Sequence, residues 1–257
     1  MNSELIIGVV GGAGPFAGLD LCNKILEETI AEKDQEFLTV INLSQPAQIL
    51  DRTEYLLRPV AQNPGIAIAK QVQRMAQIGA KVAAIPCNTA HSAPIFDVII
   101  AELARKRMDV NFLHMIRETA VSLQAAHPTI KKVGVLSTTG TYRAEIYPQF
   151  LQPAGFEVLV PDEELQISQI HPAIYDLVYG IKANGKSTRQ ARQNLLNGAM
   201  ALKEQGAEAV ILGCTEIPLA IWETAVYDMI VIDPTRILAR ALIREANPAK
   251  LKSISRV

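Results

Sequence analysis

Two stretches decide the fold: residues 81–91, KVAAIPCNTAH, and residues 209–218, AVILGCTEIP. Each begins as a short run of apolar residues, which is typical of a buried strand. Each run then ends at a Pro or Gly that precedes a cysteine, and polar residues follow the cysteine. The two stretches therefore predict two buried strands that end at Cys87 and Cys214.

The same alternation of short apolar runs and longer helical patterns extends along the chain. We expect strands at residues 5–10, 37–43, 81–85, 132–136, 156–160 and 209–212, and helices at residues 16–32, 63–78 and 188–205. Further helices are expected from residue 92 and from residue 219, after each cysteine. Strands that alternate with helices indicate βαβ units and a parallel sheet, so the predicted fold class is α/β.

The pattern also repeats within the chain. The GVV of residues 8–10 recurs as GVL at residues 134–136, and residues 79–89 correspond to residues 206–216, at offsets of 126 and 127. We infer a duplication that gives two similar lobes with parallel sheets, related by a pseudo-twofold axis, with the active site in the cleft between them. Lobe 1 is expected at residues 1–116 and lobe 2 at residues 117–226. Residues 227–257 either close lobe 2 or pack back on lobe 1.

Composition excludes several classes of protein. The 257 residues are 49% hydrophobic and 20% charged, with a net charge of −1, which argues against disorder and against a nucleic-acid or membrane-surface partner. The sequence shows no secretory signal and no apolar stretch of about 20 residues. Three cysteines, at positions 22, 87 and 214, fit neither a disulfide framework nor a zinc motif. We expect a cytoplasmic protein without a metal.

The two matched cysteines suggest acid/base chemistry. Ligands of parallel sheets bind at the carboxyl ends of the strands, and a helix N-terminus there lowers the pKa of a thiol from about 8.5. Equivalent thiols on facing lobes would lie on opposite sides of a substrate, as inversion at a carbon requires. A single buried cysteine is usually an inert core residue, and Cys22, within a helical pattern, is assigned to the core. The matched positions of Cys87 and Cys214 favour catalysis instead.

These motifs resemble those of the aspartate/glutamate racemase family over nearly the whole chain. The resemblance rests on PCNTAH at 86–91, GCTEIP at 213–218, GVVGGAGP at 8–15, DRT at 51–53, the segment 134–141, IY at 174–175, IKA at 181–183 and IDP at 232–234. Within the family, CTE at 214–216 is similar to aspartate racemases and their broad-specificity relatives. The chain as a whole resembles the free-standing aspartate racemases of microcystin-type peptide pathways, although no single motif carries that resemblance. Glutamate racemases typically carry CTH there and an Asp-Ser-Gly opening that this chain lacks.

The resemblance implies an amino-acid racemase that interconverts L- and D-aspartate without pyridoxal phosphate or any other cofactor. Cys87 and Cys214 would be its two bases, and the protein would form a homodimer. The positions that the resemblance assigns to substrate binding are Arg52, Asn88, Thr89, Lys182 and Thr215. Arg and Lys suit the recognition of carboxylates, because Arg binds them through two hydrogen bonds and Lys provides a point charge.

Five further positions are expected to line the site or to act beside its thiols. Gly12 and Ala13 belong to the first glycine turn, and Ala13 stands where the family commonly carries Met, so it could widen the pocket wall. Thr139 is the repeat equivalent of Ala13 and would line the opposite wall. Glu216 either orients or titrates with Cys214 or caps a helix, and His91 either tunes Cys87 or packs in the core.

Three alternatives remain. A glutamate or broad-specificity racemase, or an isomerase or decarboxylase of the same superfamily, would keep the fold and change the substrate or the reaction. A dinucleotide-binding oxidoreductase would explain Gly12-x-Gly14-x-x-Ala17, but the following strand lacks the acidic residue that binds a ribose. A non-catalytic amino-acid-binding protein would not need two matched cysteines.

Overall fold

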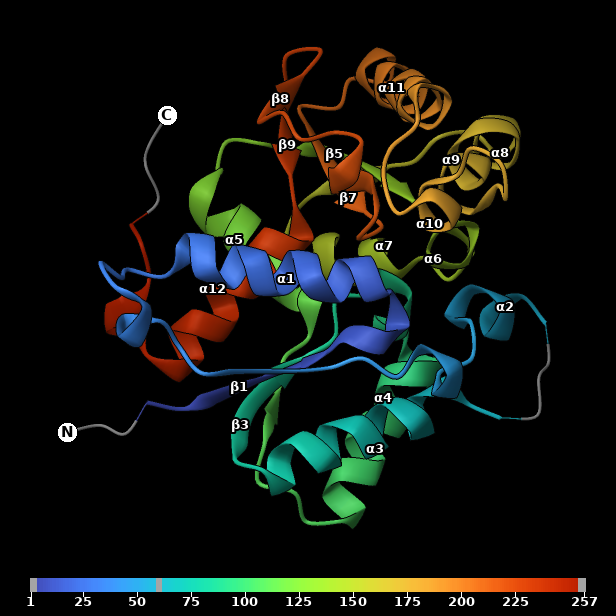
Figure 1. The fold of residues 1–257 in the computed structure, drawn as a ribbon. Coiled ribbons are helices and arrows are strands. Elements are labelled where there is room, and N and C mark those ends of the chain that lie inside the picture. Colours follow the sequence, from blue (N-terminus) through green and yellow to red (C-terminus); the bar gives the residue numbers. More distant parts are fainter. Residues whose placement is uncertain (1–3, 59–61, 254–257) are drawn as a thin grey trace. The chain divides into compact units, whose positions relative to one another are not determined.

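The computed structural model describes residues 4–58 and 62–253 of the chain (Figure 1). These residues form two compact units. Unit 1 contains residues 4–51, 62–118 and 235–253, and unit 2 contains residues 52–58 and 119–234. Each unit is built around its own sheet, and no helix among the described residues is long and apolar enough to cross a membrane.

The sheet of unit 1 is parallel, with the strand order β2-β1-β3-β4. Its strands are β1 (Ile6–Val10), β2 (Val40–Leu43), β3 (Ala80–Ala84) and β4 (Asn111–Phe112). Its helices are α1 (Pro15–Glu28), α3 (Pro64–Gln77), α4 (Ala93–Arg105) and α12 (Pro234–Ala246), and α5 (Met115–Ala126) runs from unit 1 into unit 2. Helix α1 packs against β1 and β2, and α3 packs against β1 and β3 on the opposite face (Figure 1).

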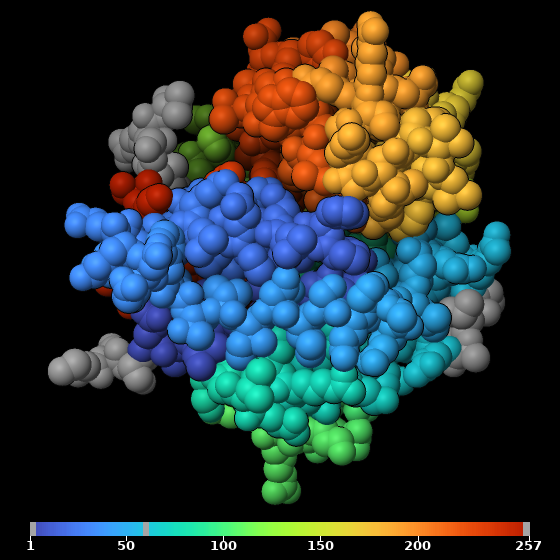
Figure 2. Space-filling view, viewed as in Figure 1, coloured from blue at the N-terminus to red at the C-terminus, as the bar shows by residue number. Residues whose placement is uncertain are grey.

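Local sequence signals start the helices of unit 1. Pro15 is the first residue of α1, where its fixed φ suits a helix and its missing N–H costs no hydrogen bond. Asn63 caps α3, since its Oδ1 accepts a hydrogen bond from the backbone of Gly65 at 2.8 Å. Figure 2 shows α1 at the surface, where its side chains Phe16 and Leu19 are exposed.

The sheet of unit 2 has the order β6-β5-β7-β9-β8, and only β8 is antiparallel to its neighbour among the described strands. Its strands are β5 (Lys132–Ser137), β6 (Glu157–Leu159), β7 (Ala209–Gly213), β8 (Ala225–Val226) and β9 (Met229–Ile232). Its helices are α2 (Arg52–Leu57), α6 (Thr139–Arg143), α7 (Ile146–Leu151), α8 (Glu163–Leu165), α9 (His171–Tyr175), α10 (Ile181–Asn184) and α11 (Arg189–Glu204). Helix α11 packs on β5 and closes a core that includes Leu136, Leu202 and Leu212.

The parallel strands of the two sheets follow the same order. In each unit the first strand lies between the second and the third, and the fourth lies beyond the third. The repeat extends to the backbone, because Gly79 after α3 and Gly206 after α11 both have positive φ, at 107° and 93°. A residue with positive φ commonly ends a helix, and glycine adopts it without strain. The prediction of an α/β fold with two parallel sheets is confirmed.

One predicted helix is wrong. After Cys214 the chain makes a 3₁₀ turn at Ile217–Leu219, and residues 220–224, all of them described, continue without a helix to β8. Arg192 of α11 donates hydrogen bonds to the Ala220 carbonyl and to Glu223. Its guanidinium also lies 4.1 Å from the centre of the Trp222 ring. These contacts hold the segment as a loop and replace the hydrogen bonds that a helix would supply.

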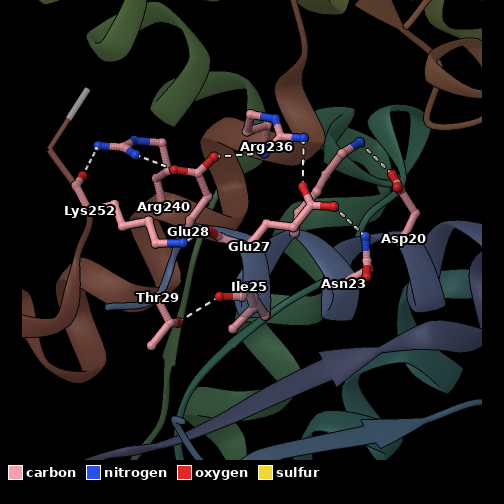
Figure 3. A network of polar contacts seen from close by, with 10 residues as sticks. Asp20, Asn23, Ile25, Glu27, Glu28, Thr29, Arg236, Arg240 and Lys252 are labelled. Carbon is pink, nitrogen blue, oxygen red and sulfur yellow. Dashed lines mark hydrogen bonds and ion pairs between the residues drawn. The ribbon is translucent and has the colours of Figure 1, made fainter. Parts of the chain in front are cut away.

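A polar network fastens α12 and the residues after it to the end of α1 within unit 1 (Figure 3). Arg236 donates to Glu28 at 2.7 Å and to Glu27 at 2.8 Å, and Arg240 donates to Glu28 and, at 2.8 Å, to the Lys252 carbonyl. Burial raises the pKa of Glu28, but the hydrogen bonds from both arginines outweigh burial and hold this pKa below its usual value. The last described segment of the chain is therefore tied to one of its first helices.

We expect the substitution Glu28→Gln to lower the free energy of unfolding by about 1–2 kcal/mol, because two hydrogen bonds to a charged acceptor are weakened. Urea unfolding followed by circular dichroism measures this change. The matched control is Glu32→Gln, an exposed residue beyond the end of α1, which should stay within about 0.5 kcal/mol of wild type. Equal losses in the two variants would contradict a role for the network.

Candidate functional site

In unit 1, two turns meet at the carboxyl edge of the sheet, because β1 and β3 are adjacent parallel strands. The chain after β3 reaches Cys87 and then forms a 3₁₀ turn at Asn88–His91, before α4 begins at Ala93. Cys87, Asn88 and Thr89 are all buried. The expected helix after residue 92 is present, and the thiol lies one turn before it.

Gly12 and Ala13 form the other turn, directly after β1. A side chain on Gly12 would lie 2.7 Å from the backbone nitrogen of Gln45, so this glycine lets the turn pack against the segment that follows β2. Ala13 is buried. The packing of the turn therefore accounts for Gly12 without any contact to a substrate.

His91 belongs to a buried aromatic cluster in unit 1. Its ring centre lies 4.7 Å from that of His114 and 5.3 Å from that of Phe96. Its Nε2 donates to the Ile85 carbonyl at 3.2 Å, while Nδ1 has no hydrogen-bond partner in the described part of the chain. Burial lowers the pKa of His91 well below its usual value, and His114 lowers it further. This histidine is neutral at physiological pH.

In unit 2, the equivalent strands β5 and β7 place Thr139 and Cys214 at the carboxyl edge of the sheet. Thr139 opens α6, and its Oγ1 accepts a hydrogen bond from Gln166 Nε2 at 3.4 Å. Its backbone N–H is directed at His171 Nδ1, 3.5 Å away. Cys214 follows β7 directly and is 5% exposed.

Glu216 connects Cys214 to Lys182. The Cys214 Sγ donates a hydrogen bond to Glu216 Oε2 at 3.0 Å, and Lys182 Nζ donates to Glu216 Oε1. The Thr215 hydroxyl lies 3.4 Å from the same Oε2. Glu216 is 4% exposed, so its charge is stabilised by these partners rather than by water.

Arg52 joins this group because residues 52–58 belong to unit 2. Helix α2 packs against α6 so closely that a side chain on Gly140 would lie 2.8 Å from the Thr53 Cα. The Thr53 hydroxyl contacts Thr138 Oγ1 and Tyr175 Oη, each at 3.4 Å. Arg52 is buried. Its positive charge is close enough to Glu216 to favour the ionised carboxylate.

The charges of this cluster oppose the effect of burial. Burial raises the pKa of Glu216, but Lys182, the hydrogen bonds from Cys214 and Lys182, and Arg52 together bring this pKa below its usual value. Burial lowers the pKa of Lys182, but Glu216 reverses the shift and the lysine stays protonated. The cluster therefore holds a carboxylate and two cations.

The predicted lowering of the thiol pKa is wrong for Cys214. Burial raises the pKa of this thiol well above its usual value, and the Glu216 carboxylate raises it further, although Lys182 acts in the opposite direction. No helix N-terminus follows Cys214 to offset these effects, because the chain makes only the short turn at Ile217–Leu219.

Two tyrosines complete the surroundings in unit 2, and one of them was not anticipated from the sequence. Tyr147 of α7 is fully buried, and its ring comes within 3.0 Å of where a Gly213 side chain would begin. Burial raises the pKa of Tyr147, and Asp233 and Cys214 raise it further. Tyr175, part of the IY motif, lies under Lys182, whose Nζ is 5.5 Å from the ring centre.

The predicted site residues thus fall into two groups, each within one unit. Unit 1 brings together Gly12, Ala13, Cys87, Asn88, Thr89 and His91 at the ends of β1 and β3. Unit 2 brings together Arg52, Thr139, Lys182, Cys214, Thr215 and Glu216. Among the described residues, no group of three His, Cys, Asp or Glu side chains is arranged to hold a metal ion.

The family model for Asp/Glu/Hydantoin racemases matches residues 10–242. The chain therefore belongs to the Asp/Glu/Hydantoin racemase family. An aspartate racemase of Picrophilus torridus has the same fold, with a TM-score of 0.79 and 30% identity over 96% of each chain.

Two relatives differ in substrate and in extent. RacX, a broad specificity amino-acid racemase of Bacillus subtilis, is 26% identical over 93% of this chain and 96% of its own length. A glutamate racemase of Pseudomonas paraeruginosa is 32% identical over 65% of this chain. The match spans 58% of that glutamate racemase, less than two thirds of its length.

The histidine cluster predicts a loss of stability in acid. Burial and Arg117 lower the pKa of His114 to about 4, and its Nδ1 accepts a hydrogen bond from the Arg117 backbone at 3.2 Å. Between pH 6.5 and 4 the unfolded chain binds a proton at this residue and the folded chain does not. The free energy of unfolding should therefore fall over this range, by about 2–3 kcal/mol for His114.

The substitution His114→Asn keeps a side-chain acceptor at the start of α5 and removes the titration. Urea unfolding at several pH values between 4 and 7 should show a smaller loss of stability for this variant than for wild type. His127→Asn, at the end of the same helix, is the control and should follow wild type. A wild-type slope in His114→Asn would refute the assignment.

Proposed function

We propose that the protein is an amino-acid racemase that interconverts L- and D-aspartate, with Cys87 and Cys214 as its two acid/base groups. The observation that carries the proposal is the equivalent position of the thiols. Each thiol follows the third strand of its sheet, and each lies next to the turn that follows the first strand. Duplicated sheets with one thiol each supply the two proton-transfer groups that racemisation needs.

In this scheme one cysteine removes the α-proton as a thiolate, and the other, as a thiol, delivers a proton to the opposite face of the carbon. The reaction requires both sulfur atoms to reach the same α-carbon from opposite faces. Racemisation of the other enantiomer exchanges their roles. Because the two thiols supply both proton transfers, the scheme uses no cofactor.

The remaining predicted residues would bind the substrate. Asn88 and Thr89 follow Cys87 on a buried turn, and Thr215 follows Cys214, so their polar groups suit an α-carboxylate and an α-amino group beside the reacting carbon. Hydrogen-bond donors at these positions would also stabilise the negative charge that develops as the α-proton leaves. Ala13 and Thr139 lie in the turns that follow the first strands and would line the walls.

The charges of unit 2 favour a substrate with a second carboxylate. Arg52, Lys182 and Glu216 together carry one net positive charge, and they are partly or fully buried. A carboxylate is stabilised by such a cationic environment more than a neutral side chain is. Similarity to an aspartate racemase over 96% of each chain agrees with aspartate as that substrate.

A broad-specificity racemase is the second candidate. The near full-length similarity to RacX supports it. If Ala13 lines the substrate pocket, its small side chain would favour larger substrates. Glutamate is a third substrate to test, because glutamate racemases are similar over part of the chain.

Purified protein incubated with L-aspartate, without added pyridoxal phosphate, should form D-aspartate up to an equal mixture of the enantiomers. Chiral chromatography measures the product, and parallel incubations with L-glutamate and L-alanine measure the specificity. We expect aspartate to react with the highest kcat/KM. Absence of D-aspartate would refute the proposal, and comparable rates with all three amino acids would favour the broad-specificity alternative.

Cys87→Ser and Cys214→Ser should each lower kcat by about 10³-fold or more, because a hydroxyl is a much poorer acid/base group than a thiol. Each variant should retain slow exchange of the α-proton with deuterated solvent from one enantiomer, and the two variants should prefer opposite enantiomers. Cys22→Ser, on α1, is the matched control and should keep wild-type activity. Unchanged racemisation by either active-site variant would exclude the two-base scheme.

A further inference from the structure

Glu216 has the geometry of a proton acceptor for Cys214. Its two carboxylate oxygens are divided between two partners, with Oε2 at 3.0 Å from Sγ of Cys214 and Oε1 bonded to Nζ of Lys182. A carboxylate only accepts hydrogen bonds, so the thiol must be the donor in this contact. The arrangement therefore describes a protonated Cys214 beside an ionised Glu216.

Burial strengthens the electrostatic interaction between Cys214 and Glu216. Cys214 and Glu216 are 5% and 4% exposed, so water contributes little to stabilising either charge. A second negative charge on sulfur, 3.0 Å from the carboxylate, would be strongly unfavourable in such a site. The negative charge of the pair resides on Glu216 and the proton on Cys214.

Groups from several other elements bear on this pair. Lys182 of α10 bonds to Glu216, and Arg52 of α2 adds positive charge near the carboxylate. Tyr175 of α9 packs against the lysine. Tyr147 of α7 lies beside Cys214, and Asp233, after β9, acts on this tyrosine. Lys182 donates a hydrogen bond to the carboxylate, and it is the cation with the largest effect in stabilising the negative charge of Glu216.

We propose that Glu216 is a positioning residue that keeps Cys214 protonated in the resting enzyme and takes up its proton when Cys214 acts as a base. This proposal rests on the proposed role of Cys214 in racemisation. In the resting enzyme Cys214 is then a thiol that is hydrogen-bonded to an ionised Glu216. By stabilising the Glu216 carboxylate, Lys182 influences how the proton is divided between Cys214 and Glu216.

The proton transfer is balanced within the pair. When Cys214 must act as a base, its S–H bond breaks, an O–H bond forms at Oε2 of Glu216, and the electron pair of the broken bond remains on sulfur. The resulting thiolate can remove the α-proton of the substrate. Turnover of the opposite enantiomer follows these steps in reverse: Cys214 donates its proton while Glu216 is still protonated, and the proton on Oε2 then returns to sulfur, which restores the thiol and the carboxylate.

The test measures the protonation of Cys214 without any substrate. Purified protein is alkylated with iodoacetamide over a range of pH values, and the rate at Cys214 is followed by mass spectrometry of the peptide that contains it. Only the thiolate reacts, so the pH midpoint of the rate reports the titration of the thiol. Cys22 in the same samples is an internal control.

Glu216→Gln should move this midpoint to lower pH by about one unit or more, because the negative charge is removed and Lys182 remains. Lys182→Met should move it to higher pH, because the carboxylate loses its cation. Glu223→Gln removes a carboxylate from the separate ion pair with Arg192 and should leave the midpoint unchanged. A purely structural role for Glu216 would not shift the midpoint in opposite directions in the first two variants.

An unchanged midpoint in folded Glu216→Gln, or shifts of the same sign in both variants, would overturn the proposal. If Glu216→Gln does not fold, as judged by circular dichroism, the shift in Lys182→Met decides the question. Because this experiment needs no turnover, its outcome is independent of the racemisation assay. Opposite shifts without racemase activity would refute the proposed function alone, and racemase activity with unchanged midpoints would refute the role of Glu216 alone.

Discussion

The parallel pairing of the strands is the constraint on which the rest of the structure depends. Parallel neighbours must be joined by crossovers, so the carboxyl ends of all strands in a sheet lie at one edge. In unit 1 this rule brings the turn after β1 next to Cys87, and in unit 2 it brings Thr139 next to Cys214. Each candidate group of site residues is a direct consequence of strand order.

The two units use this common plan with different electrostatics. Four residues after Cys87 lies His91, which is neutral and belongs to an aromatic cluster. The surroundings of Cys214 are ionic, with Glu216 and Lys182 in direct contact. The two units share the order of their parallel strands and the positions of the thiols, whereas the side chains near the two thiols differ.

The sequence was sufficient to predict β1, β2, β3, β5, β6 and β7, the helices α1, α3, α4 and α11, and the position of both thiols after a strand, because each depends on a local apolar pattern followed by a break. The short strands β4, β8 and β9 and the helices α5 and α12 were not predicted. The loop after Cys214 was predicted wrongly, because contacts from Arg192, distant in sequence, decide its conformation. The link from Lys182 to Glu216 and the approach of Tyr147 to Gly213 could not be predicted for the same reason. A motif indicates which residue types are present, whereas tertiary packing determines which of them meet.

The polar network between α1 and α12 affects the order in which the protein can fold during its synthesis. Unit 1 is assembled from three separate segments, and its third segment, residues 235–253, is translated after all of unit 2. While the ribosome makes unit 2, Glu27 and Glu28 lack the arginines that they bond to in the finished protein. Unit 2 can therefore complete its sheet, and the surroundings of Cys214 after β7, before the unit that holds Cys87 is finished.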